Sequence, residues 1–248
     1  MLILLPPSES KRAAERGKPL DFARLTAPAL TPLRVRLLDA LQDLCRADPA
    51  RAIEVLGLGP TQFDLVVQNA ELTTRPAAPA SRVYTGVLYA ALGLDDLTGQ
   101  DLRRANRRIA IVSALFGIVR PSDRIPAYRL SGGSRVPGIG PLTGYWREPL
   151  TGEVASHRGL VVDMLSTPYA SMVALPRRAV TVKVWRDAPG GRRTAVSHFN
   201  KATKGELARL LATAPQAAQT PADVLDVVRA GGWRAGLDGA RLDVWMRE

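Results

Sequence analysis

Apolar residues follow two periodicities along this chain, and each predicts a different kind of element. Short continuous apolar runs are typical of strands buried on both faces, whereas apolar residues recurring every three or four positions are typical of amphipathic helices. Continuous runs predict strands over residues 1–5, 108–113, 160–164, 179–186 and 242–246. Helical spacing predicts helices over residues 31–46, 49–55, 61–72, 97–106, 145–155, 204–212 and 222–230, a helix entered through residues 83–86, and a break near Pro149.

The predicted strands and helices do not form a regular strand–helix–strand repeat. This mixture favours an α+β fold, a mixed sheet surrounded by helices, over a doubly wound dinucleotide-binding fold. The length fits one domain over residues 1–248, with a helical subregion over residues 31–72. A hairpin through residues 189–191 is expected to extend the strand 179–186 into a strand over residues 194–199.

The segment 113–130 carries the densest group of candidate functional residues. It begins where a predicted buried strand ends, and prolines break it into a turn. A packed strand that leads cations and a phenol into a loop is typical of a surface for an anionic ligand. The candidates in this segment are Ser113, Arg120, Asp123, Tyr128 and Arg129.

Two further segments place lysines beside predicted strand ends. Lys11 follows the first strand and the hydroxyl of Ser8, so its amine can hold a phosphate or carboxylate, although the glycines of a P-loop are missing. Lys201 and Lys204 lie where a strand passes into a helix, and a helix N-terminus favours an anion. The alternative is that these are solvated surface lysines. The residues expected to line one basic cleft are Ser8, Lys11, Tyr84, Ser113, Asp123, Tyr128, Arg129 and Lys201.

Residues 56–59 read Leu-Gly-Leu-Gly between two short helical patterns, the arrangement of a helix-hairpin-helix element. The amides of Gly57 and Gly59 can meet a phosphate at the start of the second helix, since glycine allows a tight turn and a close approach. An ordinary helix–helix turn is the alternative. Residues 137–140, Pro-Gly-Ile-Gly, look similar but follow a strand-like segment, which favours a mobile loop over the site.

The chain is strongly basic, with 34 Lys and Arg against 23 Asp and Glu, a net charge of +11. Such a field attracts polyanions, nucleic acid above all. The cations are nearly all arginine, however, which is equally expected of a GC-rich genome.

Other classes of site have little support in the sequence. The single cysteine, Cys45, forms no internal disulfide, and its helical pattern makes it a core residue in a reduced, cytoplasmic setting. The two histidines, His157 and His198, lack metal-ligand spacing, so no metal and no cofactor are predicted. The opening apolar run is too short for a signal peptide or a membrane span, and a monomer without membrane contact is expected.

The motifs above resemble those of the YaaA family of peroxide stress proteins. Segment 113–130 matches that family's long pattern, with Ala114 in place of a glycine. The similarity spans nearly the whole chain, weakest in the first hundred residues, and Ala202 replaces a second lysine of the family pattern. Matching residues in segment 113–130 are Ser113, Leu115, Phe116, Gly117, Arg120, Pro121, Asp123, Pro126, Tyr128, Arg129 and Leu130. Corresponding positions elsewhere are Lys11, Lys201, residues 83–86, residues 145–146, residues 165–169 and Lys204, which stands where the family pattern has an arginine.

The resemblance implies a cytoplasmic protein that protects cells from peroxide by limiting free iron and DNA damage, and that binds duplex DNA largely without sequence specificity. Under this hypothesis, phosphates would be neutralised by Lys11, Arg120, Arg129, Lys201 and Lys204, with backbone donors from Gly57 and Gly59. The rival hypothesis is an enzyme acting on a small anionic substrate such as a nucleotide or nucleobase, through Lys11, Tyr128 and Lys201. DNA binding needs cations spread along a groove, whereas an enzyme needs them to meet within a few ångström.

Overall fold

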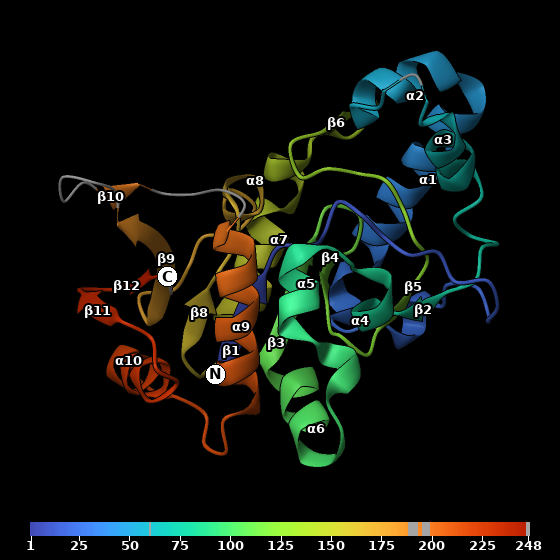
Figure 1. Ribbon diagram of the computed structural model, residues 1–248. Helices are drawn as coiled ribbons and strands as arrows, with labels where there is room; N and C mark the ends of the chain where they lie inside the picture. The colour runs from blue at the N-terminus through green and yellow to red at the C-terminus, as the bar shows by residue number, and fades with distance from the viewer. Residues whose placement is uncertain (60, 188–192, 195–198, 247–248) are drawn as a thin grey trace.

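One mixed sheet organises the protein, whose computed structural model describes residues 1–59, 61–187, 193–194 and 199–246 (Figure 1). The five inner strands run parallel, and antiparallel strands flank them. In spatial order the strands are β11 (Ala235–Asp238), β12 (Arg241–Trp245), β9 (Ala179–Asp187), β8 (Val161–Asp163), β1 (Leu2–Leu5), β3 (Ile109–Ser113) and β4 (Gly117–Val119), with β10 (Arg193–Thr194) beside β9. Two small ribbons pair β2 (Ala78–Pro79) with β5 (Arg124–Ile125) and β6 (Arg135–Val136) with β7 (Gly140–Pro141).

Helices cover both faces of this sheet. The longer helices are α1 (Thr31–Ala47), α2 (Pro49–Leu56), α3 (Phe63–Ala70), α6 (Gly99–Arg108), α7 (Leu142–Ser156), α9 (Phe199–Thr213) and α10 (Pro221–Ala230). Single turns of helix are α4 (Ala80–Val83), α5 (Val87–Leu92) and α8 (Thr167–Ala170), with 3-10 turns at Phe22–Arg24, Pro28–Leu30 and Leu94–Asp96. Figure 1 shows α5, α6 and α9 in front of the sheet and α7 behind it.

Burial explains why the sequence forms these layers. Every residue of β1 and β3 is buried, as expected of strands covered on both faces. Helix α9 can lie close to α5 because Gly205 has no side chain: a Cβ there would stand 2.2 Å from the carbonyl oxygen of Leu88. The strands and helices therefore share one continuous hydrophobic core.

The order in which the chain adds strands to the sheet reverses at β1 and β3: β3 is added on one side of β1, and β8 is added later on its other side. The connection from β1 reaches β3 through α6 on the front face, and the connection from β3 returns past β1 to β8 through α7 on the back (Figure 1). Parallel crossovers are right-handed, so travel in opposite directions puts the helices on opposite faces. Loops that leave neighbouring strands toward opposite faces open a crevice at the carboxyl ends of those strands. This topology predicts a ligand site above Leu5 and Ser113.

The α+β class with a mixed sheet is confirmed, and most predicted elements lie within a few residues of their expected bounds. The predicted break near Pro149 is wrong, because α7 runs through it and buries Trp146, Leu150 and Val154 along one face. The sequence reasoning did not predict β4 or β11. Residues 137–139 form the turn of the β6–β7 hairpin, and Gly140 begins β7. The predicted hairpin turn at residues 189–191 lies outside the described residues, as does most of the expected strand 194–199.

Candidate functional site

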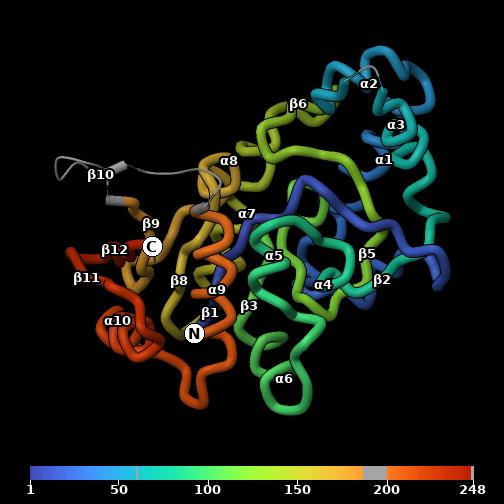
Figure 2. Tube along the Cα trace, viewed as in Figure 1, coloured from blue at the N-terminus to red at the C-terminus, as the bar shows by residue number. Residues whose placement is uncertain are grey.

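Four of the five tyrosines of the chain gather at the carboxyl edge of the parallel strands. After β1 the chain crosses this edge toward α4 and α5, as the dark blue segment of Figure 2 shows. The centroids of the Tyr84 and Tyr89 rings lie 5.4 Å apart, and Tyr128 meets Tyr84 edge-on at 6.5 Å. Tyr89 donates its hydroxyl to the carbonyl of Pro6 over 2.7 Å, which holds the loop after β1 against the cluster.

Buried hydroxyls form a row inside this cluster. The hydroxyl of Tyr128 lies 3.0 Å from that of Tyr84 and 2.7 Å from Ser113 Oγ, which also accepts the amide of Phe116 over 3.0 Å. Burial raises the pKa of Tyr84 and of Tyr128 well above the ordinary tyrosine value. The row is therefore neutral and offers O–H donors rather than a phenolate.

Lys11 lies directly on the tyrosine cluster. Its backbone pairs with that of Tyr84 in an isolated antiparallel bridge, and its Nζ stands 4.3 Å from the ring centroid of Tyr128. The amine donates to the carbonyl of Ser8 over 2.7 Å and makes a longer contact, 3.4 Å, with the carbonyl of Glu9. Burial, with a smaller contribution from the Arg129 charge, lowers the pKa of Lys11 to about 7. Within the described residues, no carboxylate forms an ion pair with this amine.

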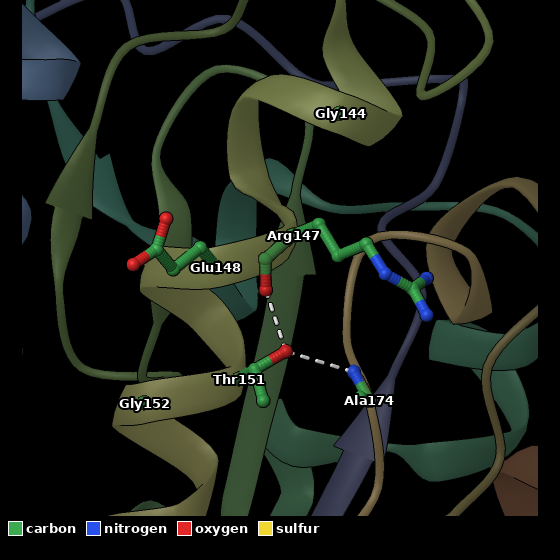
Figure 3. Close-up of a pocket in the computed structure, with 6 residues that line it drawn as sticks. All are labelled: Gly144, Arg147, Glu148, Thr151, Gly152 and Ala174. Atoms are coloured by element: carbon green, nitrogen blue, oxygen red, sulfur yellow. Dashed lines mark hydrogen bonds between the residues drawn. The ribbon is translucent and has the colours of Figure 1, made fainter.

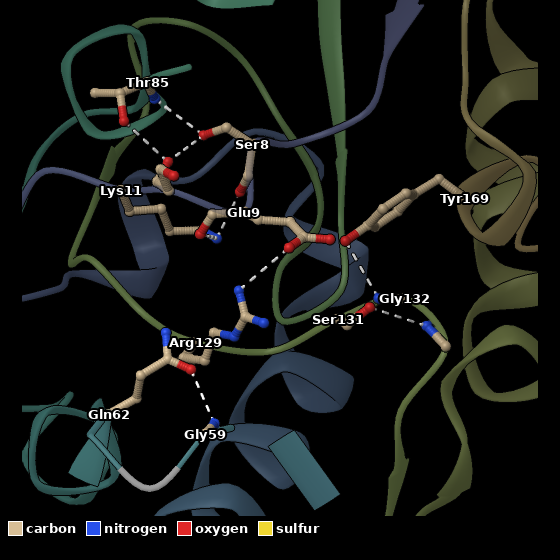
Figure 4. Close-up of polar contacts among 12 residues, drawn as sticks. Ser8, Glu9, Lys11, Gly59, Gln62, Thr85, Arg129, Ser131, Gly132 and Tyr169 are labelled. Atoms are coloured by element: carbon tan, nitrogen blue, oxygen red, sulfur yellow. Dashed lines mark hydrogen bonds and ion pairs between the residues drawn. The ribbon is translucent and has the colours of Figure 1, made fainter. Parts of the chain in front are cut away.

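Arg129 brings a second cation to the same place. The buried side chain of Asn69 holds its backbone on both sides, donating to the Arg129 carbonyl over 2.7 Å and accepting its amide over 2.9 Å. Arg129 Nη1 lies 3.6 Å from the carboxylate of Glu9, a side chain that is 77% exposed. Arg129 Nε is buried and has no hydrogen-bond partner in the described part of the chain. Figure 4 shows the Glu9 side chain extending between Arg129 and Tyr169.

We refer to this group as the Lys11 site. It consists of Glu9, Lys11, Tyr84, Ser113, Tyr128, Arg129 and Tyr169. Tyr169 lies beside the Glu9 side chain (Figure 4), and its hydroxyl accepts the amide of Gly132 over 3.2 Å. The site combines a titratable amine, a guanidinium, neutral hydroxyl donors and aromatic faces, which suits an anionic ligand that also carries a polar or reactive group.

The other predicted lysines lie on α9. Lys204 donates to the carbonyls of Met164 and Leu165, over 3.0 and 3.3 Å, just beyond the carboxyl end of β8. Burial lowers the pKa of Lys204 to about 8, and the nearby carboxylate of Asp163 opposes this shift. Lys201 is exposed on the first turn of the same helix. Part of its motif, residues 197–198, lies outside the described residues.

Three predicted site residues have structural roles elsewhere. Arg120 donates to the carbonyls of Arg107 and Ile109, each over 2.9 Å, at the amino end of β3 and away from the Lys11 site. The buried carboxylate of Asp123 accepts the amides of Thr26 and Arg120 and so fixes a turn. The Ser8 hydroxyl accepts the amide of Thr85 over 2.9 Å and so holds the loop (Figure 4). Lys11 donates to the backbone carbonyl of Ser8 and not to this hydroxyl.

The Leu-Gly-Leu-Gly turn does join two helices, α2 and α3. Gly57 ends α2 in the left-handed conformation, with φ of +61°. The amide of Gly59 is already bound by the side chain of Gln62 over 3.0 Å. Pro60 lies outside the described residues, and phosphate binding by this turn remains a prediction.

Sequence reasoning missed Glu9, Asn69, Tyr89 and Tyr169 as parts of this arrangement. The signal for Glu9 was its position two residues before Lys11, and the signal for Tyr169 was its place in a motif shared with the resembling family. Asn69 gives no local signal, since it acts through the backbone of a residue far along the chain.

Two surface hollows lie away from the Lys11 site. One, of about 550 Å³, follows α7 and is lined by Gly144, Arg147, Glu148, Thr151, Gly152 and Ala174 (Figure 3). The other, of about 380 Å³, is lined by Gln100, Arg103, Arg104, Arg107 and Pro215. Over the described residues, no three His, Cys, Asp or Glu side chains gather as a metal site would require, and no helix is long and apolar enough to cross a membrane.

The fold and the Lys11 site define an α+β protein with a lysine, arginine and tyrosine cluster at the carboxyl edge of a mostly parallel sheet. The family model described as "Peroxide stress protein YaaA" matches residues 1–235. The chain belongs to this YaaA family. The matched range holds every residue of the Lys11 site.

Relatives support this membership. The chain is 44% identical to a UPF0246 protein of Streptomyces coelicolor over 261 residues, which cover 100% of this chain and 99% of the relative. It is 42% identical to a UPF0246 protein of Corynebacterium efficiens, with 97% of each chain covered. A UPF0246 protein of Tolumonas auensis is 28% identical over 93% of this chain and 91% of its own length.

Proposed function

We propose that the Lys11 site is the active site of an enzyme that acts on a small anionic substrate, as part of the peroxide stress role that its family description names. The observation that carries this proposal is the meeting of Lys11 and Arg129. The Lys11 amine lies on the Tyr128 ring without an ion-paired carboxylate in the described chain, and the Arg129 Nε beside it is buried without a partner.

The arrangement of these cations favours a small substrate over a DNA backbone. A protein that tracks phosphates keeps its cations exposed and spread along a groove, where each can release a counterion. Here the lysine is lowered in pKa by burial and the arginine side chain is only 20% exposed. Placing two cations together in an apolar setting costs free energy, which is typical of a site that uses them for chemistry.

Each group has a role in this proposal. Lys11, with a pKa of about 7, exists as amine and as ammonium near neutral pH and can accept or donate a proton during the reaction. Arg129 binds the anionic group of the substrate through Nη1, the nitrogen that Glu9 now faces. The one O–H that the Tyr84, Tyr128 and Ser113 row does not use internally donates to an oxygen of the substrate that gains negative charge.

Lys11→Arg tests this function, because guanidinium keeps the positive charge but does not lose its proton. The assay is peroxide survival of a bacterial strain whose own family member is deleted, complemented by each variant. We expect Lys11→Arg to fail and Lys18→Arg, a change at an exposed lysine, to complement fully. Circular dichroism must show that both variants are folded. Full complementation by Lys11→Arg would show that the function does not need proton transfer at residue 11.

Sequence-independent binding of duplex DNA is the second candidate function. Two observations favour it: the net charge of +11, and the hollow on α6 where Arg103, Arg104 and Arg107 line one surface. Arg103 and Arg107 are exposed, so they remain open to phosphates. Lys201 is also exposed, but it lies on the first turn of α9, whereas Pro215 of this hollow follows the last turn of that helix.

The salt dependence of DNA affinity tests this second candidate. A footprint of about five phosphates gives a log–log slope of about −4 to −5. Replacing both Arg103 and Arg107 by Gln removes two positive charges. The negative log–log slope should then become shallower by about two. No binding at low salt would eliminate DNA as a partner. Unchanged binding by the double variant would move the contact surface away from α6.

A further inference from the structure

We propose that Lys11 is a nucleophile that forms an imine with the substrate, and that the substrate is a small carboxylate bearing an aldehyde or ketone. The inference rests on the proposed function and names the substrate class of the same site. Arg129 would bind the carboxylate while the Lys11 amine reaches the carbonyl carbon beside it. The simplest members of this class are 2-oxo acids, in which the two groups are adjacent.

The choice of lysine at this position is the first argument. The chain contains 29 arginines and only five lysines. Guanidinium serves every purely electrostatic role but is not a nucleophile, whereas a neutral amine attacks carbonyl carbon. Lys11 and Arg129 lie close together, and we assign them different roles. Lys11 reacts with the substrate, and Arg129 binds its anionic group.

The surroundings of the amine are the second argument. One carbonyl, that of Ser8, accepts from Lys11 Nζ at short range, and the ring of Tyr128 covers one side. A carboxylate partner would hold the amine as ammonium, and none forms an ion pair with it in the described chain. Burial and the Arg129 charge favour the neutral form, the form that adds to a carbonyl, and outweigh the opposing effect of the Glu9 carboxylate on the pKa of Lys11.

Imine formation needs proton transfers at the carbonyl oxygen, and the hydroxyl row can relay these protons while it stays neutral. The neutral amine adds to the carbonyl carbon, the carbonyl π pair moves to oxygen, and that oxygen takes a proton while the nitrogen loses one. The resulting hydroxyl takes a second proton and leaves as water, and the nitrogen lone pair completes a protonated imine. The balance is one amine, one carbonyl and one proton in, one iminium and one water out, without oxidant or reductant. The row of Tyr84, Tyr128 and Ser113 has three hydroxyl protons and two internal hydrogen bonds, so one O–H is left to donate to this oxygen.

Glu9 marks the place of the substrate carboxylate. Its own carboxylate lies 3.6 Å from Arg129 Nη1, and its side chain is largely exposed on a loop that can move outward. An incoming carboxylate would take this position and pair with Arg129 Nη1. Glu9 thus competes with the substrate for Arg129.

The experiment traps the imine on the full chain. Protein is incubated with cyanoborohydride and one probe: pyruvate or glyoxylate (carbonyl and carboxylate), acetone (carbonyl alone) or acetate (carboxylate alone). Peptide mass spectrometry then locates the reduced adduct. The exposed Lys18 and Lys183 are internal controls for general amine reactivity.

We expect pyruvate or glyoxylate to modify Lys11 about tenfold faster than the exposed lysines, and acetone to show little preference. Arg129→Gln should slow the Lys11 reaction about tenfold, and Glu9→Gln should accelerate it. Acetate should slow the reaction of pyruvate by occupying Arg129. Even labelling of all five lysines, or a Lys11 rate no higher than that of Lys18 with every probe, would overturn the imine.

The same samples separate this inference from the proposed function. Binding of acetate and pyruvate is followed by the thermal melting temperature of the native chain and of Arg129→Gln. If both anions bind through Arg129 and Lys11 is never trapped, the imine is overturned while an acid–base enzyme stands. If Lys11→Arg restores peroxide survival, the enzyme proposal falls as well. Trapping at Lys11 in a chain that also requires Lys11 for survival supports both.

Discussion

The two ends of strand β3 hold basic residues of opposite character. At its amino end Arg120 donates to the carbonyls of Arg107 and Ile109, and Arg108 donates to three carbonyls at the end of α9, those of Leu211, Ala212 and Ala214. At its carboxyl end Lys11 lies over the rings of Tyr84 and Tyr128, the charge of Arg129 acts on its amine, and Arg129 Nε lacks any partner among the described residues. At the amino end of β3 the arginines donate to backbone carbonyls. At the carboxyl end one guanidinium nitrogen has no hydrogen-bond partner among the described residues.

This difference shows why net charge is a poor guide to function. Arg120 counts toward the +11 of the chain as fully as Arg129 does. Its donors, however, already satisfy carbonyls that the strand end leaves open, so no ligand is needed to explain it. The partners of a cation, more than its position in a motif, decide whether it is available to bind a ligand.

The largest effect should follow removal of Arg120. Arg120→Met leaves the carbonyls of Arg107 and Ile109 without their donor, and hydrogen bonds to charged groups are worth about 1.5–3 kcal/mol each. We expect a loss of about 3 kcal/mol in the free energy of unfolding by urea. Arg129→Met should cost far less, since among the described residues its guanidinium pairs only with Glu9, at 3.6 Å. Equal losses for both variants would erase the contrast between the two ends.

Ser113→Ala should have the next largest effect, at the other end of the same strand. The change removes the acceptor of the Phe116 amide and a partner of the Tyr128 hydroxyl, both fully buried. An unsatisfied buried group costs about 1–3 kcal/mol, so we expect a loss of about 2 kcal/mol. Tyr84→Phe, which removes one bond at the end of the row, should cost about 1 kcal/mol. A larger loss for Tyr84→Phe would mean that the row is organised around Tyr84 instead of Ser113.

Much of the fold could be predicted because local pattern and burial agree. The apolar runs of β1 and β3 predict inner strands, and the structure buries all of their residues. Strand β4 escaped prediction because its three residues, Gly117–Val119, follow β3 after a short turn and look like its continuation. Pro149 led to the wrong prediction of a helix break. The proline removes one helical hydrogen bond, but breaking α7 would expose the apolar face formed by Trp146, Leu150 and Val154, which costs more free energy.

The site could be predicted only in part, since its geometry is set by topology. The sequence offered Lys11, Tyr84, Ser113 and Tyr128 as candidates beside strand ends, and the structure brings these four into contact. Arg120 stood in the same motif as Arg129 but points to the opposite end of the sheet, a distinction that only the partners reveal. Whether these residues carry catalysis remains a prediction for the experiments above.

The pH dependence of the free energy of unfolding tests whether Lys11 lacks an anionic partner, as the contrast between the two ends of β3 requires. Its pKa is about 7 in the folded chain and near the ordinary 10.5 when unfolded. Between these values the unfolded state holds a proton that the native state has lost, so the free energy of unfolding rises with pH, by at most about 1.4 kcal/mol per pH unit. Below pH 7 both states are protonated and the penalty of a buried ammonium is complete.

Lys11→Met isolates this contribution. The native chain should gain stability relative to Lys11→Met as pH rises from 7 toward 9, measured by urea unfolding at each pH. Lys18→Met, at an exposed lysine, should follow the native chain throughout. A constant difference between native chain and Lys11→Met would mean that Lys11 keeps its proton and has an anionic partner.

The smallest effects concern the turn between α2 and α3, where the same question of partners can be asked of backbone amides. Gly57→Ala should cost about 1 kcal/mol, because its φ of +61° disfavours a Cβ even though no atom lies within 4 Å of one. Gln62→Ala should change stability by only about 0.5 kcal/mol, because the Gly59 amide that it releases is exposed and can bind water. If this turn is a working DNA hairpin, the released amide should strengthen duplex binding at low salt, and Gly57→Ala combined with Gly59→Ala should weaken it while the protein stays folded. Duplex affinity that ignores all three substitutions would leave the turn as a helix connection, with its amides satisfied inside the fold like the guanidinium of Arg120.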